Sequence, residues 1–283
     1  NIFTVFEEKV ILAQGELIST GMVNLYMLEQ GVKSCLLPAL EYMRIDKNNE
    51  PDTAYIRENL SAILEKNAGY DIYITQGYIC RNAFGEVDNL QRGGSDYTAS
   101  LIGAAILADE IQIWTDIDGM HNNDPRFVDN TKPVSNLSFD EAAELAYFGA
   151  KILHPTCVLP AKVNNIPVRL LNTMDPKAHG TLISAAQCEK RIAAIAAKDS
   201  ITAIKIKSGR MLLAYGFMRK VFEIFESHKT SIDMITTSEV GVSVTIDNAR
   251  HLEEIVDDLK KYGTVEVDKH QVIICVVGDL VAS

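Results

Sequence analysis

The sequence has 283 residues, 47% of them hydrophobic, and a formal net charge of −11 at pH 7. A chain of this length can bury a sizeable core, and at roughly 150 residues per domain it predicts about two domains. The acidic balance, with an isoelectric point near 5.0, argues against nucleic acid or an anionic membrane surface as a partner.

The five cysteines are scattered, odd in number and free of Cys-x-x-Cys spacing. This usage is typical of reduced core thiols and not of a disulfide framework or a zinc site. No apolar run approaches the ~20 residues of a bilayer span, and residues 1–15 lack a signal-peptide pattern. We therefore expect a cytoplasmic protein.

Helix-like and strand-like segments alternate from the start of the chain to about Ile183. Apolar residues recur at helical spacing from Leu17 until Gly31 ends the run. A strand-like segment follows at 32–37, and the pattern at 71–79 predicts a buried strand. Such alternation predicts a mainly parallel sheet covered by helices on both faces.

A glycine pair, Gly93 and Gly94, opens the next apolar helix, with Arg92 before it and Asp96 after it. Glycines allow positive φ values and close approach, and first-turn N–H groups offer donors to an anion. Arg92 can bind a carboxylate through two nitrogens while Asp96 binds an ammonium group, so a small zwitterion fits here. For this motif alone, a plain loop in which Ser95 or Asp96 caps the helix is the commoner arrangement.

Two further polar segments follow regular elements. Residues 114–119 leave a strand of alternating apolar residues and lead to 123–126, a position where open α/β sheets bind nucleotides. The alternative is a surface turn with self-bonding aspartates. Lys151 follows a helix announced by Ser138 and Glu141 at capping-box spacing, and it can reach a phosphate or simply be a solvated lysine.

The pattern changes after residue 183. We expect a linker at 184–200, of which 184–191 is polar and unpatterned. A strand, a helix, two strands, a second helix and a strand-rich segment follow at 201–207, 217–228, 231–236, 241–246, 249–262 and 264–277. This order predicts a ferredoxin-like regulatory module.

Taken together and in this order, these segments resemble the aspartate kinases of the amino-acid kinase family over nearly the whole chain. The motifs that carry the resemblance are Gly15-Glu16-Leu17-Ile18-Ser19-Thr20, Thr75-Gln76-Gly77-Tyr78-Ile79, Arg92-Gly93-Gly94-Ser95-Asp96, Trp114-Thr115-Asp116, Asp124-Pro125-Arg126, Phe148-Gly149-Ala150-Lys151 with His154-Pro155, and Ile235-Thr236-Thr237-Ser238-Glu239-Val240. The resemblance implies an α/β catalytic domain at 1–183, with a carbamate-kinase-like, mainly parallel sheet sandwiched by helices. It also implies an α+β ACT regulatory region at 201–283, whose second unit is incomplete.

The resemblance further implies a reaction, the transfer of the γ-phosphoryl group of ATP, with Mg²⁺, to the side-chain carboxylate of L-aspartate. The product is 4-phospho-L-aspartate, in the first step of lysine, threonine and methionine biosynthesis. An aspartate carboxyl has a pKa of ~3.9 and needs no general base at neutral pH, so catalysis consists of positioning and charge neutralisation. The implied substrate-binding residues are Glu16, Tyr78, Arg92, Ser95 and Asp96. The implied ATP-binding residues are Thr115, Asp116, His121, Arg126 and Lys151.

The chain departs from the family pattern in places that affect these expectations. Family members open with a Lys-Phe-Gly-Gly turn that contacts the transferring phosphate, and this chain begins at Asn1, past that turn. We therefore assign no catalytic residue and expect a partial chain, short at both ends, with little kinase activity by itself. His121 stands where many members have a nucleotide-contacting tyrosine, and Gln91 where glycine is common.

The C-terminal region resembles lysine-sensitive members, in which ACT units of two subunits form a pocket for free L-lysine. The implied allosteric residues are Met211, Gly216, Phe217, Met218, Ser231, Ile232, Asp233, Ser238 and Glu239. Asp233 is the expected ammonium partner, and the N–H groups after Gly216 are expected to bind the carboxylate. Such a pocket implies a homodimer or a larger assembly. The alternative is that the apolar members are core residues and Asp233 is a strand-edge acid.

Other functions stay open at this point. One is a non-catalytic amino-acid sensor that uses only the ACT region. Two others are a different amino-acid kinase acting on a carboxylate and the kinase part of a fusion with homoserine dehydrogenase. The joint presence of Glu16, Arg92 and Asp96 favours an aspartate kinase, since a pure sensor has no use for a substrate-binding set.

Overall fold

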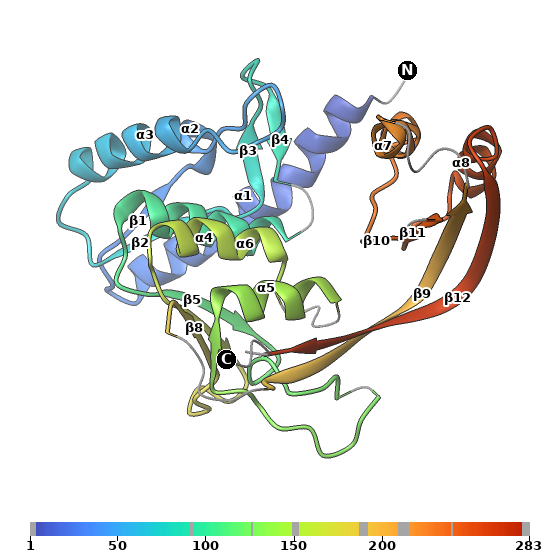
Figure 1. Cartoon of the computed structure of the whole chain (residues 1–283). Coiled ribbons are helices and arrows are strands. Elements are labelled where there is room, and N and C mark those ends of the chain that lie inside the picture. Colours follow the sequence, from blue (N-terminus) through green and yellow to red (C-terminus); the bar gives the residue numbers. More distant parts are fainter. Residues whose placement is uncertain are drawn as a thin grey trace. The chain divides into compact units, whose positions relative to one another are not determined.

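The computed structural model describes residues 4–90, 93–125, 127–148, 153–186, 192–208, 215–238 and 240–278 (Figure 1). The chain divides into two compact units. The first consists of Asn1–Ala196 with Val276–Ser283, and the second of Ala197–Cys275. No helix in the described part of the chain combines the length and apolar character that a bilayer span requires.

The first unit alternates helices and short strands, as the sequence predicts. Its elements are α1 (Val5–Glu29), β1 (Ser34–Leu37), α2 (Ala39–Tyr42), α3 (Thr53–Lys66), β2 (Ile72–Thr75), β3 (Ile79–Arg81), β4 (Val87–Asn89), α4 (Gly94–Ile106), β5 (Ile111–Thr115), β6 (Asn136–Ser138), α5 (Phe139–Phe148), α6 (Pro155–Val163), β7 (Val168–Asn172) and β8 (Thr181–Ser184). The predicted capping box is confirmed, because Ser138 N donates to Glu141 Oε2 at 2.7 Å and Glu141 N donates to Ser138 Oγ at 3.2 Å.

Parallel pairing dominates the first unit, as expected. β1 pairs in parallel with β2, β5 with β7, and β6 with β8. The antiparallel pairs are β7 with β8, which completes a sheet of order β5-β7-β8-β6, and the hairpin of β3 and β4. Helix α4 packs against α3, α6 and β5.

The expected buried strand at 71–79 is wrong in two respects. Its chain breaks after Thr75, and Ile72 and Tyr73 of β2 are exposed. The break has a physical cause. Gln76 is only 1% exposed, and its side chain forms hydrogen bonds with other elements, while Tyr78 has a positive φ of 68° that no strand continues through. The residues after the break, Gly77 and Tyr78, lie against the first turn of α4.

The second unit is one antiparallel-rich sheet covered by two helices. Its elements are β9 (Ala194–Lys207), α7 (Phe217–Ser227), β10 (Met234–Thr237), β11 (Gly241–Ile246), α8 (Leu252–Leu259) and β12 (Thr264–Val277), with β9 and β12 extending into the first unit. The strand order β10-β11-β9-β12 is that of the predicted ferredoxin-like module. Alternate residues of β9 and β11, among them Ile204, Ile206 and Val244, pack against Phe217 and Phe225 of α7.

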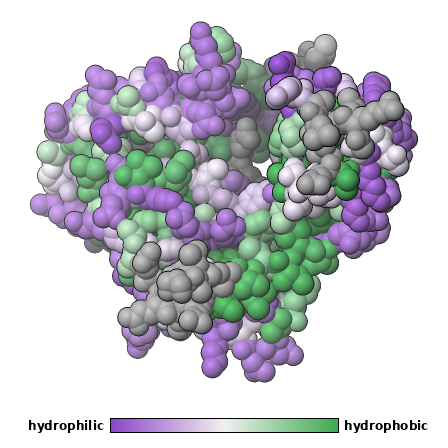
Figure 2. Space-filling model, viewed as in Figure 1, coloured by the Kyte–Doolittle hydropathy of each residue, from purple (hydrophilic) through white to green (hydrophobic). Residues whose placement is uncertain are grey.

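Residues 194–200, which we expected in a linker, form the first half of β9. The reason is that Ala194 and Ala196 are buried while Ile195 is exposed, which is the alternation of a strand. On β12 the exposed apolar residues Val272 and Ile274 share one face of the strand. Figure 2 shows a green apolar patch over the area where Figure 1 draws β9 and β12.

Candidate active site

The first turn of α4 is packed closely against two other segments through its glycines. Gly93 has φ 74°, and a Cβ built on it would lie 2.4 Å from the Cβ of His154. A Cβ on Gly94 would lie 2.7 Å from Cδ2 of Tyr78. No other residue type fits both positions, so the glycine pair permits the close approach that the sequence predicts.

The segment Gly77–Tyr78 lies on the first turn of α4. A Cβ on Gly77 would lie 3.0 Å from Ser95 Oγ, and Tyr78 N donates to Thr98 Oγ1 at 3.1 Å. Thr98 Oγ1 in turn donates to Gly94 O at 2.7 Å. The structure thus brings Tyr78, Ser95 and, one residue further along α4, Asp96 into one neighbourhood.

Asp96 is a partly buried acid in the first turn of α4. Burial raises the pKa of its carboxyl, and the nearby His154 ring opposes that shift. His154 is the N-cap residue of α6, and its Nδ1 lies 2.7 Å from Thr156 Oγ1. A carboxylate that loses part of its hydration in this way attracts a cation more strongly than one in bulk water.

Gln76 is a residue that sequence reasoning passed over as a functional candidate. Its Nε2 donates to Thr20 Oγ1 of α1 at 2.8 Å, and its Oε1 accepts from Ala39 N of α2 at 2.8 Å. Thr20 Oγ1 also donates to the carbonyl oxygen of Glu16 at 2.6 Å, one helical turn earlier. These bonds bring the Glu16 turn of α1 beside the residue that precedes Gly77.

The predicted nucleotide loop leaves β5 and is fixed to β8. Thr115 Oγ1 accepts from Ile117 N at 3.0 Å, which turns the chain at Asp116. Met120 N donates to Thr181 Oγ1 at 2.8 Å. A Cβ on Gly119 (φ 112°) would lie 2.5 Å from that hydroxyl, so the return of the loop passes directly over β8.

His121 holds this loop together through both ring nitrogens. Its Nε2 lies 2.6 Å from Asp118 Oδ1, and its Nδ1 lies 2.8 Å from Thr131 Oγ1. Both nitrogens are therefore engaged within the loop. The arrangement gives His121 a positioning role, and its contact with a nucleotide stays a prediction.

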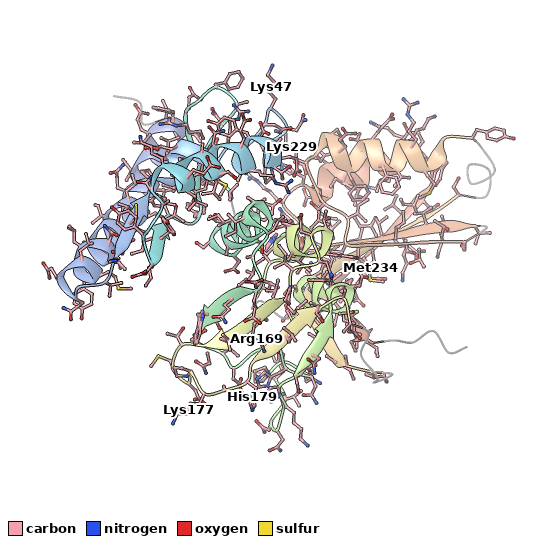
Figure 3. All side chains as sticks on the ribbon, turned by 90° about the vertical axis from the view of Figure 1, so that its left-hand side faces the viewer. Lys47, Arg169, Lys177, His179, Lys229 and Met234 are labelled. Carbon is pink, nitrogen blue, oxygen red and sulfur yellow. The ribbon has the colours of Figure 1, made fainter. Side chains whose placement is uncertain are left out.

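The hairpin loop between β7 and β8 is a second feature that motif reasoning missed. β5 and β7 are parallel, with Thr115 opposite Asn172, and Thr173 N donates to Thr115 O at 2.8 Å. The loop after β7 therefore starts beside Asp116. It carries Lys177 and His179, which lie beyond Arg169 of β7 in Figure 3. No sequence motif marks this loop. Its position beside Asp116 follows from the parallel pairing of β5 with β7.

The predicted regulatory residues fall at two ends of one α-β unit. Gly216 is the N-cap of α7, a helix of 11 residues that is roughly 16 Å long, and Asp233 lies between the end of α7 and the start of β10. Ser238, at the far end of β10, returns toward the Gly216 end. Ser231 and Ile232 lie beside Asp233, while Phe217 and Met218 pack on the hydrophobic core of this unit.

Several predicted site residues lie outside the part of the chain that the structure describes. They are Arg92, Arg126, Lys151, Met211 and Glu239. Within the described ranges, no group of three or more His, Cys, Asp or Glu side chains is arranged to hold a metal ion.

Comparison with known proteins places this geometry among related structures. A model of the amino acid kinase family matches residues 3–172. Chloroplastic aspartokinase 3 of Arabidopsis thaliana is 35% identical over 95% of this chain, which spans 51% of that relative, about half its length. E. coli aspartokinase III in complex with aspartate and ADP (R-state) matches with a TM-score of 0.85 and 34% identity, covering 97% of this chain and 64% of that one. The complex of E. coli aspartokinase III with lysine and aspartate (T-state) matches with a TM-score of 0.79, at the same identity and coverage.

Proposed function

This chain belongs to the amino acid kinase family, and we propose on that premise that it carries the substrate-binding part of an aspartokinase. The observation that supports the proposal most directly is the meeting of Gly77–Tyr78 with Gly93–Asp96 at the first turn of α4. The related E. coli enzyme with the same fold binds aspartate and ADP. The proposed reaction is phosphorylation of the L-aspartate side-chain carboxylate by ATP.

The substrate is a zwitterion with an additional carboxylate, and the site offers matching charges. In the proposal, Asp96 and Glu16 hold the α-ammonium group, and Arg92 binds the α-carboxylate through two nitrogens. Ser95 and the free N–H groups at the start of α4 complete the anion-binding side. Tyr78 forms the wall that positions the side chain of the substrate.

The chemistry then needs positioning and charge neutralisation. The attacking carboxylate is ionised at neutral pH, because its unperturbed pKa is ~3.9. Thr115 and Asp116 line the nucleotide in the proposal, with Arg126 and Lys151 at its phosphates. Magnesium in such sites is held largely by nucleotide phosphates, water and one or two carboxylates, a need that Asp116 fits. When bound, Mg²⁺ neutralises part of the phosphate charge.

We also propose feedback regulation by free L-lysine through the second unit. The E. coli relative is known in complex with lysine and aspartate. Here, the side chain of Asp233 is only 3% exposed and already pairs with the ammonium group of Lys198, a setting in which a carboxylate attracts an ammonium group strongly. In the proposal the lysine pocket is shared by two copies of the second unit, which implies a homodimer.

The test is ATP-dependent ADP release by the full-length protein with a panel of acceptors: L-aspartate, L-glutamate, N-acetyl-L-glutamate and UMP. The proposal predicts release with L-aspartate and little with the others. Release with UMP or L-glutamate in place of L-aspartate would assign the chain to another activity of the family. Addition of millimolar L-lysine tests the regulatory part, with inhibition as the expected result.

A further inference from the structure

Cys157, in the first turn of α6, lies against the first turn of α4. Its thiol donates to Gly93 O, with the sulfur 3.6 Å from the oxygen. The same oxygen accepts the first hydrogen bond of α4, from Tyr97 N at 3.0 Å. A carbonyl oxygen has two lone pairs, so it can accept both bonds at once. Cys157 is only 1% exposed, and its thiol is therefore sheltered from water.

These two bonds determine how the peptide group between Gly93 and Gly94 is turned. A trans peptide group is planar, and its C=O and N–H bonds point in opposite directions. Because Gly93 O faces Tyr97 N and the Cys157 thiol, the N–H of Gly94 points away from both, toward the N-terminal side of α4. The N–H groups of a first helical turn have no acceptor within the helix and are open to a ligand there.

We propose that the Cys157 thiol holds the Gly93–Gly94 peptide group in the orientation that presents the N–H of Gly94 to the α-carboxylate of the substrate. Cys157 is then a positioning residue, since it acts on the substrate only through the backbone of α4. The inference rests on the proposed function and adds to it a residue, on a second helix, that sets the affinity for the amino-acid substrate.

A peptide group between two glycines needs such a support. Rotation of the group changes mainly ψ of the residue before it and φ of the residue after it, and glycine adopts positive and negative φ with similar ease. After the rotation, Gly93 O would point to the side where the N–H of Gly94 was, and it would repel a carboxylate there. The rotation breaks the bonds from Tyr97 N and from the thiol together, so the thiol adds its own bond to the resistance.

The surroundings of Cys157 keep it a hydrogen-bond donor. Burial, and after it the charge of Asp96, raise the pKa of the Cys157 thiol to about 12. The thiol is therefore protonated at neutral pH, and it is a poor nucleophile. His154, one turn earlier on α6, packs against the other side of the same contact, because a Cβ on Gly93 would lie 2.4 Å from its Cβ. The first turn of α6 thus contacts Gly93 through packing and through a hydrogen bond.

The experiment compares Cys157→Ala with Cys157→Ser in the full-length protein. Alanine and serine have similar volumes, but only serine keeps a donor. In Cys157→Ala, we expect KM for L-aspartate to rise about two- to tenfold, with kcat and KM for ATP near the wild-type values. Cys157→Ser should restore most of the affinity. The control is Val158→Ala, which opens a cavity at a position of α6 that is 2% exposed but removes no donor, and its KM should be unchanged. An unchanged KM in folded Cys157→Ala, or equal rises in Cys157→Ala and in either other variant, would overturn the inference.

Hydrogen exchange without substrate separates this inference from the proposed function. The N–H of Tyr97 loses its acceptor whenever the Gly93–Gly94 peptide group rotates, so it should exchange faster in Cys157→Ala and at nearly the wild-type rate in Cys157→Ser. If the wild type does not phosphorylate L-aspartate but exchange at Tyr97 follows this order, the proposed substrate is wrong and the role of Cys157 stands. If Tyr97 exchanges equally in the wild type and Cys157→Ala, the inference is wrong, even where L-aspartate is the substrate.

Discussion

The backbone of Gly93 lies directly against the side chain of His154, so close that a Cβ at position 93 would be 2.4 Å from the Cβ of the histidine. This contact fixes the first turn of α4 against His154, the N-cap residue of α6. Because φ of Gly93 is 74°, a side chain here is opposed by backbone strain as well as by the clash. The position of the predicted substrate-binding turn depends on this contact.

Gly93→Ala tests that dependence. Left-handed backbone strain and overpacking together should cost about 2–4 kcal/mol of unfolding free energy, and kinase activity should fall because α4 shifts. The measurement is urea unfolding alongside activity. Gly85→Ala is the matched control, since Gly85 also has a positive φ of 83° but no atom within 4 Å of the added Cβ. Equal losses for both variants would show that strain alone acts and that the contact with His154 is unimportant.

Asp96→Asn should separate substrate binding from stability. Losing one partner of a charged pair should weaken binding of the transition state by about 2–5 kcal/mol. The value of kcat/KM for L-aspartate should fall accordingly, while KM for ATP stays nearly unchanged. Unchanged kcat/KM for aspartate in the folded variant would remove Asp96 from the substrate site.

The raised pKa of Asp96 predicts the sign of a stability change. Its folded-state pKa lies above the ordinary value because burial disfavours the charge. The folded state therefore binds the proton more tightly, and the stabilisation present below the ordinary pKa is lost as the pH rises through the folded-state pKa. At pH 7 the buried charge destabilises the fold, so Asp96→Asn should unfold at a higher urea concentration than the wild type. A gain that persists unchanged at a pH below both pKa values would contradict this cause.

Much of the second unit could be predicted from the sequence, because its periods are clear. The strand at 241–246 and the helix beginning at Phe217 lie where alternation and helical spacing place them. The start of α5 could be predicted equally well, because its capping box involves two residues only three positions apart in the sequence.

The rest depends on contacts between residues that are far apart in the chain. The break of 71–79 at Gln76 follows from bonds to Thr20 and Ala39, which no local pattern reveals. Lys198 of β9 pairs with the carboxylates of Asp233 and Asp247, which lie 35 and 49 residues away in the sequence, and these pairs become visible only when the strands are placed. The structure shows that Tyr78, Ser95 and Asp96 lie close together, as the substrate-binding prediction requires. The roles of these residues stay predictions.

Gln76→Leu tests the buried amide beside the site. The change keeps a similar volume but leaves the N–H of Ala39 without its acceptor, which should cost about 1–3 kcal/mol of unfolding free energy. KM for aspartate should rise as well, because the Glu16 turn of α1 loses its bond to Gln76. Gln112→Leu, on an exposed position of β5, is the comparison. If both variants have the same stability and KM, Gln76 does not position the site.

His121→Phe should weaken nucleotide binding through the loop. The variant loses the bonds to Asp118 and Thr131, so KM for ATP should rise several-fold while KM for aspartate stays near normal. A double-mutant cycle with Asp118→Asn shows whether His121 acts through Asp118 or independently of it. If His121 acts by holding Asp118, the double variant should be no worse than either single one. Fully additive effects would mean that the two residues act separately.

The most direct test of the central claim traps the product of the full-length protein with hydroxylamine. An acyl phosphate formed on the side chain of L-aspartate gives the β-hydroxamate, which chromatography separates from the α-isomer. The account predicts ATP-dependent β-hydroxamate, lost in Arg92→Ala and reduced in Asp96→Asn. No hydroxamate, the α-isomer instead, or undiminished product from both folded variants would contradict it.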